Sequence, residues 1–282
     1  MAKVLVIGAG AVGAFYGSLL AKAGDEVSVV CRSDYDQVKR HGFIIDSHPL
    51  GRWNFIPAHV LKNAADFEGT ADYILLCTKV IPTLDRATLI RPAVGRNTAI
   101  VFIQNGVEIE QEMLDAFPDN EVVSGLAFIC CNRVGPGEIL HLAYGRLALG
   151  NLPNGISNKT AQLCESFNQS GIECNASEDI VTGRWQKCVW NAPFNPLSVL
   201  SGGLPTLDIL KPRSLSCAAS CRKFATSRQH ADTPCPTILL TSISNTPTPC
   251  RLIKPACCWI MKAASRWRRK PSWAIHCAPP GG

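Results

Sequence analysis

The chain has 282 residues, of which 46% are hydrophobic and 14 are cysteines, and its net charge is +6. A chain of this length can bury a large core, as one big domain or two moderate ones. The cysteines form no CxxC pair and no zinc-type spacing with histidines, which counts against a thioredoxin-type site and against a metal site. We therefore expect reduced thiols, a cytoplasmic location and no metal.

The charge is divided unevenly along the chain. Residues 1–210 carry 16 Lys and Arg against 21 Asp and Glu, a net charge of −5, whereas residues 211–282 carry 12 basic residues and one acid, a net charge of +11. Nine of the 19 prolines and seven of the 14 cysteines also lie in this last quarter. The composition changes near Leu210, so the two parts have to be interpreted separately.

The first 31 residues predict a dinucleotide-binding unit. The apolar run Lys3–Ile7 is typical of a buried parallel strand, and it leads into Gly8-Ala9-Gly10-Ala11-Val12-Gly13. A helical pattern follows to Gly24, and a second apolar run occupies Glu26–Cys31. Between a strand and a helix, GxGxxG indicates that the loop backbone and the helix N-terminus bind a pyrophosphate. This explains the uncharged stretch Val4–Ala21 without a signal peptide or a membrane span.

The residue after the second strand bears on which nicotinamide cofactor is bound. Enzymes that use NAD usually place a carboxylate there, which holds the ribose 2′-hydroxyl and would repel a 2′-phosphate. This chain has Arg32, a planar cation suited to phosphate. Asp34 lies close by, and an ordinary surface arginine is the simpler alternative. We expect NADP(H) as the cofactor.

Three further runs follow at the spacing of an α/β protein: Ala71–Lys79, Thr98–Gly106 and Glu121–Cys131. They predict a doubly wound, Rossmann-type parallel sheet. The first two runs end in Lys79 and Asn105, at the strand ends where open α/β sheets bind ligands. Either residue alone could cap the next helix, but two at equivalent positions favour ligand contact.

A polar face is predicted on the helix that begins near Asp179. Lys187, Asn191 and Asn195 are spaced i, i+4, i+8 and so share one face, among large apolar side chains. A solvated stripe is the alternative, although such stripes usually carry more charges. Hydride transfer to a carbonyl leaves negative charge on its oxygen, which an ammonium stabilises and can protonate. The face therefore suggests carbonyl reduction.

The motifs GAGAVG, LCTK, QNGVE and K-x3-N-x3-NPL, spread over residues 1–205, together resemble the ketopantoate reductase family. The resemblance implies NADPH-dependent reduction of 2-dehydropantoate to (R)-pantoate, a step towards pantothenate and coenzyme A. It also implies that Lys187 donates the proton and that Asn191 and Asn195 hold the substrate. Asn105 would lie at the nicotinamide and the substrate, and Lys79 near the cofactor.

These inferences divide the chain into a Rossmann domain (1–177), the start of an all-helical second domain (178–210) and a tail (211–282). We expect a small 2-oxo acid as partner, no nucleic acid and no membrane, and either a monomer or a homodimer. Two alternatives stay open: another NAD(P)-dependent 2-ketoacid or 3-hydroxyacid dehydrogenase, and a non-catalytic NADP-binding remnant. Fold class alone does not choose among them.

The tail does not resemble the helical domain of the family, which contributes a serine and a glutamate to the site. Its prolines oppose long helices, and no apolar period of 3.6 residues continues past Leu210. An unfolded basic tail, a nucleic-acid-binding arm and a metal module are the plain interpretations of its composition.

A shifted reading frame offers a sharper interpretation of the tail. When each codon is read from the third base of the codon before it, Cys258 and Trp259 both become leucine codons whatever the wobble base. Ile260 is likewise forced to an aspartate codon, and Lys262 to a glutamate codon. The shifted stretch resembles the C-terminal motif of the family, with the missing glutamate at the place of Arg268. We therefore expect residues 211–282 to be out of frame.

Overall fold

The structure is a computed structural model, and it describes residues 1–202. The chain divides into two units, Met1–Cys188 and Val189–Gly282. The predicted out-of-frame segment, 211–282, lies outside the described residues. The predicted domain boundaries at residues 177 and 210 stay predictions.

Strands and helices alternate along most of the described chain. The strands are β1 (Lys3–Ile7), β2 (Glu26–Val30), β3 (Phe43–Ser47), β4 (Gly51–Phe55), β5 (Val60–Leu61), β6 (Tyr73–Leu76), β7 (Ala99–Phe102), β8 (Val122–Gly135), β9 (Glu138–Asn151) and β10 (Cys174–Ala176). The helices are α1 (Ala11–Lys22), α2 (Tyr35–His41), α3 (Arg86–Ile90), α4 (Gln111–Ala116), α5 (Asn158–Gln169) and α6 (Ile180–Leu200), with short 3-10 turns at Ala64–Asp66 and Arg91–Ala93.

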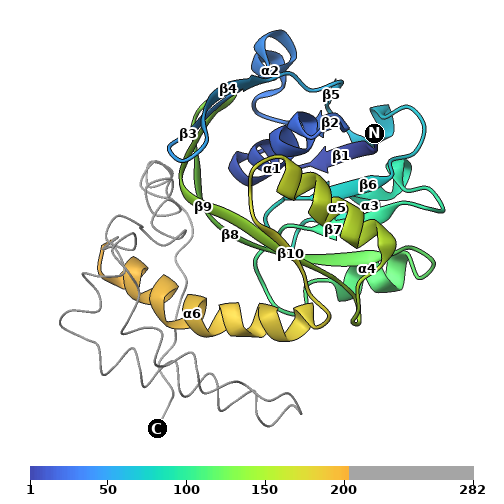
Figure 1. Ribbon diagram of the computed structural model, residues 1–282, viewed down its shortest axis with the longest axis vertical. Helices are drawn as coiled ribbons and strands as arrows, with labels where there is room; N and C mark the ends of the chain where they lie inside the picture. Colours follow the sequence, from blue (N-terminus) through green and yellow to red (C-terminus); the bar gives the residue numbers. More distant parts are fainter. Residues whose placement is uncertain (203–282) are drawn as a thin grey trace, which may run out of the picture. The chain divides into compact units, whose positions relative to one another are not determined.

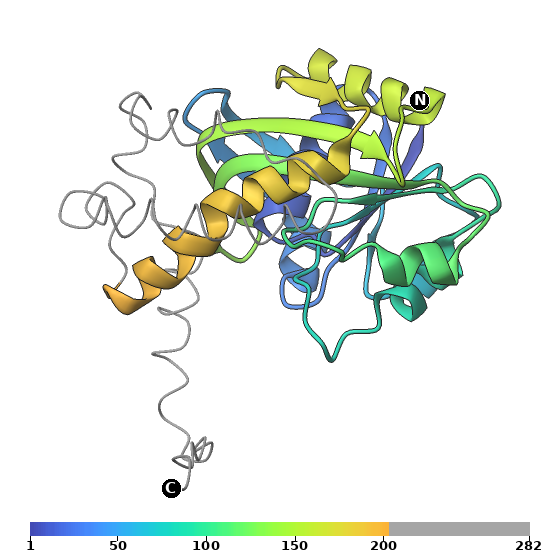
Figure 2. The ribbon, with the colours of Figure 1, turned by 90° about the horizontal axis from the view of Figure 1, so that it is seen from below.

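Within the described residues, the strands form one ten-stranded sheet in the order β4-β3-β9-β8-β7-β6-β1-β2-β5, and β10 pairs with β9. The six neighbouring strands β8, β7, β6, β1, β2 and β5 are parallel to one another. On the other side of β8, strand β9 pairs with it in the antiparallel direction. The long β8–β9 pair has three register shifts and curls round to β3 and β4 (Figure 1), and Figure 2 shows the same pair from below. This confirms the predicted α/β, Rossmann-type sheet.

The strand register places four loops at one edge of the sheet. Ile7 of β1 pairs with Val30 of β2 on one side and with Leu76 of β6 on the other, and Leu76 pairs with Phe102 of β7. These residues therefore form one row across the sheet, each at or near the end of its strand. The chain leaves β1 towards β2 and later returns to β6 on the opposite side, so the strand order reverses beside β1. Open α/β sheets bind ligands at such a switch point.

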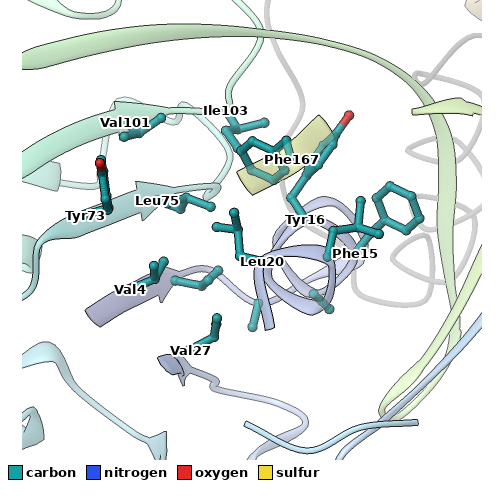
Figure 3. Close-up of a cluster of buried hydrophobic side chains, with 14 of the residues drawn as sticks. Val4, Phe15, Tyr16, Leu20, Val27, Tyr73, Leu75, Val101, Ile103 and Phe167 are labelled. Atoms are coloured by element: carbon teal, nitrogen blue, oxygen red, sulfur yellow. The ribbon is translucent and has the colours of Figure 1, made fainter. Parts of the chain in front are cut away.

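The sheet is covered on both faces, which explains why its central strands are continuously apolar. Successive side chains of a strand point to opposite faces. Val4 and Val6 lie in one buried cluster with side chains of α1 and α5, shown in Figure 3. Leu5 and Ile7 lie in a second cluster with side chains of α3 and α4.

The five strands predicted from the sequence are present as β1, β2, β6, β7 and β8, with ends that differ by up to four residues. The predicted helix after Asp179 is α6, which runs through Pro193 and Pro196. None of the helices within residues 1–202 is long and apolar enough to cross a bilayer.

Candidate functional site

The glycine-rich loop packs tightly on one side and is open on the other. Gly8 has φ +90°, and a Cβ there would lie 2.8 Å from Thr78 Cγ2. A Cβ on Gly13 would lie 2.5 Å from the Gly8 carbonyl oxygen. A Cβ on Gly10 would meet nothing within 4 Å, and Gly10 is exposed. The first and third glycines are therefore needed for packing, whereas the second leaves space above the loop.

That space suits a phosphate group. Helix α1 begins at Ala11, directly after Gly10, and no side chain caps its N-terminus. The amide groups of a first helical turn have no intrahelical acceptor, and the helix dipole adds positive potential there. Ala9, Ala11 and Val12, the other predicted loop residues, carry small or apolar side chains and so contribute through their backbone. The loop thus fits the pyrophosphate of a dinucleotide.

Arg32 lies two residues after the end of β2, next to this loop. Its side chain is exposed, and within residues 1–202 no hydrogen bond or ion pair engages its guanidinium group. Asp34 is the nearby carboxylate that could instead favour NAD(H). It is by contrast buried and accepts hydrogen bonds from Arg133, Gly137 and Ser33. Of the two side chains, only Arg32 is presented to solvent.

Lys79 is exposed and follows Thr78 at the end of β6. Thr78 lies against Gly8 and accepts hydrogen bonds from the Gln104 amide, at 2.5 Å to its carbonyl oxygen and 3.0 Å to its hydroxyl. Gln104 in turn accepts a hydrogen bond of 3.0 Å from the buried Arg86. A chain of contacts therefore links the glycine-rich loop to the residue that precedes Asn105.

Lys187 of α6 meets Asn105 at the same edge of the sheet. The Lys187 ammonium donates to Asn105 Oδ1 at 2.9 Å and to the Ala127 carbonyl of β8 at 2.6 Å, and it lies 5.2 Å from the centre of the Phe128 ring. Asn105 is exposed, and Gly106 after it has φ +134°. The structure thus brings together two residues that lie 82 positions apart. Their roles toward cofactor and substrate stay predictions.

Burial shifts the pKa of Lys187 towards neutrality. Its pKa is lowered to about 8, first by loss of solvation and second by the positive charge of Arg184, with a small opposing effect from Cys188. A buried amine favours the neutral form because a charge is poorly solvated there. An amine with this pKa holds a proton at pH 7 and releases it more readily than an ordinary lysine.

A buried ion pair, which the sequence did not reveal, holds this part of the site. Arg184 lies one helical turn before Lys187 and is 4% exposed, and its guanidinium contacts Glu110 at 2.7 Å. It donates to the carbonyls of Gln104 and Gly106 at 2.8 and 2.9 Å. These two carbonyls flank Asn105, so Arg184 fixes the backbone that presents it.

The sequence held a weak signal for this ion pair. Arg184 precedes Lys187 by three residues and so shares its face, in a helix that also carries large apolar side chains. A buried arginine cannot be told from a surface one by spacing alone, and its partner Glu110 lies 74 residues earlier in the chain.

Asn191 and Asn195 lie on α6 at the expected spacing from Lys187. Both belong to the second unit, and their predicted contact with substrate stays a prediction. Within residues 1–202, no group of three His, Cys, Asp or Glu side chains could hold a metal ion.

Comparisons with known proteins identify relatives of the chain. A family profile described as ketopantoate reductase PanE/ApbA matches residues 4–154. The chain is similar to a 2-dehydropantoate 2-reductase of Nostoc, with 33% identity over 203 residues, which cover 70% of this chain. The match spans 63% of the Nostoc protein, so the chain spans less than two thirds of the length of this relative. A 2-dehydropantoate 2-reductase of Pyrococcus horikoshii is 26% identical, over 74% of this chain and 68% of its own length.

Solved structures show the same relationship. The crystal structure of 2-dehydropantoate 2-reductase from Methylococcus capsulatus is 48% identical, with a TM-score of 0.85, covering 93% of this chain and 84% of that one. A D-mandelate dehydrogenase solved with NADH and anilino(oxo)acetate shares the fold at 21% identity, with a TM-score of 0.81 over 92% of this chain and 85% of its own. The family profile covers more than half of the chain, and the chain belongs to the ketopantoate reductase PanE/ApbA family.

Proposed function

We propose that the chain is an NADPH-dependent 2-dehydropantoate 2-reductase by descent, which reduces 2-dehydropantoate to (R)-pantoate on the way to pantothenate and coenzyme A. The observation that carries the proposal is the Lys187 ammonium, hydrogen-bonded to Asn105 at the edge of the sheet that also bears the glycine-rich loop. The names of the relatives supply the substrate.

The residues would divide the work as follows. Bound reduced nicotinamide supplies hydride to the ketone carbon. The loop from Gly8 to Gly13 and the N-terminus of α1 would hold the pyrophosphate, and Arg32 would contact the 2′-phosphate. Lys79 would lie beside the cofactor. This set positions the reactants and leaves the proton to α6.

Lys187 would stabilise the oxygen that becomes an alkoxide and then protonate it. An ammonium has three N–H donors, and two of them go to Asn105 and Ala127. Within residues 1–202 no further acceptor is described for this ammonium, so the third donor would serve the substrate oxygen. Asn191 and Asn195 would donate hydrogen bonds to the substrate hydroxyl and carboxylate.

The tail bears on activity. The shifted reading of residues 211–282 implies that this chain lacks the serine and glutamate with which the family completes its site, so we expect it to bind NADPH but to turn over poorly. Losing groups that act together costs catalysis more than it costs cofactor affinity. Sequencing the DNA across codons 205–215, together with the mass of the purified protein, tests the frame: one continuous frame at the original locus excludes the shift.

The activity test compares this chain with a frame-restored chain, each mixed with NADPH and 2-dehydropantoate, while the absorbance of the reduced nicotinamide is followed. We expect NADPH to bind both chains and the restored chain to oxidise it. In the restored chain, Lys187→Ala should lose roughly 10²-fold or more in turnover with NADPH affinity retained. Faster turnover of another 2-oxo acid would favour a related dehydrogenase, and failure of both chains to bind NADPH would refute the proposal.

We expect a cytoplasmic protein, since its 14 cysteines suit a reducing compartment. The monomer or homodimer stays a prediction, which light scattering on the purified chain can decide.

A further inference from the structure

Asp34 lies two residues after Arg32 and so close to the position where a carboxylate commonly selects NAD. Its side chain is only 5% exposed, and each group described as bonded to its carboxylate donates a hydrogen bond to it. Arg133 Nε donates to Oδ2 at 2.6 Å, and Arg133 Nη2 donates to Oδ1. Ser33 Oγ donates at 2.9 Å and the Gly137 amide at 3.1 Å. The carboxylate is therefore enclosed by donors from its own loop and from the β8–β9 hairpin.

The protonation state of Asp34 agrees with this geometry. Burial by itself would raise the pKa of its carboxyl group, but the hydrogen bonds from Arg133, Gly137 and Ser33 outweigh burial and leave the pKa lowered. Asp34 is thus a carboxylate at neutral pH, paired with a guanidinium. Although it begins α2, its side chain makes no capping hydrogen bond to that helix. Its bonding capacity is directed to Arg133 instead.

Arg133 comes from the end of β8, 99 residues further along the chain, and it is brought to Asp34 by the tip of the hairpin. The tip is itself fixed in place. Gly137 has φ +70°, and a Cβ on it would lie 3.1 Å from the Gly42 carbonyl oxygen. Its own carbonyl accepts a hydrogen bond of 2.9 Å from Ile44 of β3. The long curled hairpin therefore delivers one cation, at a fixed position, to the loop that carries Arg32.

We propose that Arg133 is a specificity-determining residue for the phosphorylated cofactor: it neutralises Asp34 and turns its carboxylate away from the ribose, so that Arg32 alone faces the 2′-phosphate. This inference rests on the proposed function, because it concerns how the same site distinguishes NADPH from NADH. Arg133 acts through Asp34 and is a positioning residue. The Asp34 carboxylate engages Nε and Nη2 of Arg133 and neutralises its charge, which leaves the phosphate to Arg32.

The expected effect follows from Coulomb's law. Two residues of chain span at most about 7 Å, so we take roughly 8 Å as the separation between the Asp34 carboxylate and a 2′-phosphate held by Arg32. Repulsion between one carboxylate and a phosphate dianion at that distance in water weakens NADPH binding roughly fourfold at 10 mM ionic strength and about twofold at 150 mM. NADH lacks the 2′-phosphate, so this repulsion is absent from its binding at either ionic strength.

The experiment measures the Kd of NADPH and of NADH for the full chain by isothermal titration calorimetry, at 10 and 150 mM ionic strength. The proteins are the wild type, Arg133→Gln, Asp34→Asn and the double variant. A matched control is Arg96→Gln, which removes an exposed arginine that lies before β7, at the opposite end of the strands. Circular dichroism melting verifies that each variant folds.

Arg133→Gln should weaken NADPH binding roughly fourfold at low salt and leave NADH binding unchanged, and the loss should shrink at high salt. Asp34→Asn leaves the charge of Arg133 uncompensated and should strengthen NADPH binding by a similar factor at low salt. The double variant should return to the wild-type preference, since both charges are gone. Equal losses of affinity for both cofactors, or a double variant that still behaves like Arg133→Gln, would overturn the inference. Arg133 would then only stabilise the fold of this loop. If the wild type binds neither cofactor, the proposed function fails, and this inference fails with it.

Discussion

Replacing Arg184 by methionine should destabilise the chain severely, because the ion pair that it forms is almost completely buried. Arg184 is 4% exposed and its partner Glu110 is 5% exposed. The substitution leaves the Glu110 carboxylate with only the Ser124 hydroxyl, at 2.9 Å, as a described partner. Breaking a buried ion pair by removing one member costs about 3–5 kcal/mol, since a charge stays buried without compensation. For a unit of nearly 190 residues, this corresponds to a fall in Tm of roughly 6–20 °C.

The assay is thermal unfolding at pH 7, followed by tryptophan fluorescence and by circular dichroism. The double variant Arg184→Met/Glu110→Gln should recover at least half of the loss, because it removes the unpaired carboxylate. Arg52→Met is the matched control, since Arg52 lies exposed on the edge strand β4 and should cost no more than about 0.5 kcal/mol. A loss below about 1 kcal/mol for Arg184→Met, or no recovery in the double variant, would refute the role given to this ion pair.

Three further predictions concern the cofactor loop, the cofactor preference and pH. Gly10→Ala should keep the wild-type Tm and weaken NADPH binding at least roughly tenfold, because its methyl group enters only the space left for phosphate. Gly13→Ala should weaken binding and also lower the free energy of unfolding by about 1–3 kcal/mol, since its methyl group would lie 2.5 Å from the Gly8 carbonyl oxygen. Arg32→Asp should lower or reverse the NADPH:NADH affinity ratio in the same calorimetry, and an unchanged ratio would exclude Arg32 from the pocket. The pKa of the buried His141 is lowered, chiefly by loss of solvation, so the unfolded chain takes up a proton below about pH 6.5 that the folded chain does not. Urea unfolding should therefore show stability falling from pH 7 to pH 5, with a smaller fall in His141→Gln, and equal slopes would contradict this.

The central part of the sheet was predictable because its strands are buried on both faces and read as short, continuous apolar runs. The curled part was harder to predict. Strand β9 contains Gly145 and residues of mixed exposure, and its pairing with β8 shifts register three times. Neither an apolar run nor a regular alternation marks such a strand.

The same distinction holds for the site. Gly8, Gly10 and Gly13 could be assigned from local sequence, because a tight turn with a phosphate above it constrains consecutive residues. The Arg184–Glu110 and Arg133–Asp34 ion pairs could not, because each joins segments more than 70 residues apart and depends on how the sheet curls. The sequence offered charged residues at these positions, and only the folded chain decides which are buried together.

The pKa of Lys187 in the wild-type chain tests the central claim most directly. The rate of acetylation of each lysine by a water-soluble reagent, measured by mass spectrometry from pH 6 to 11, reports its fraction of neutral amine. We predict that Lys187 titrates near pH 8 and that NADPH slows its modification. A midpoint near 10.5, with no protection by NADPH, would contradict this claim.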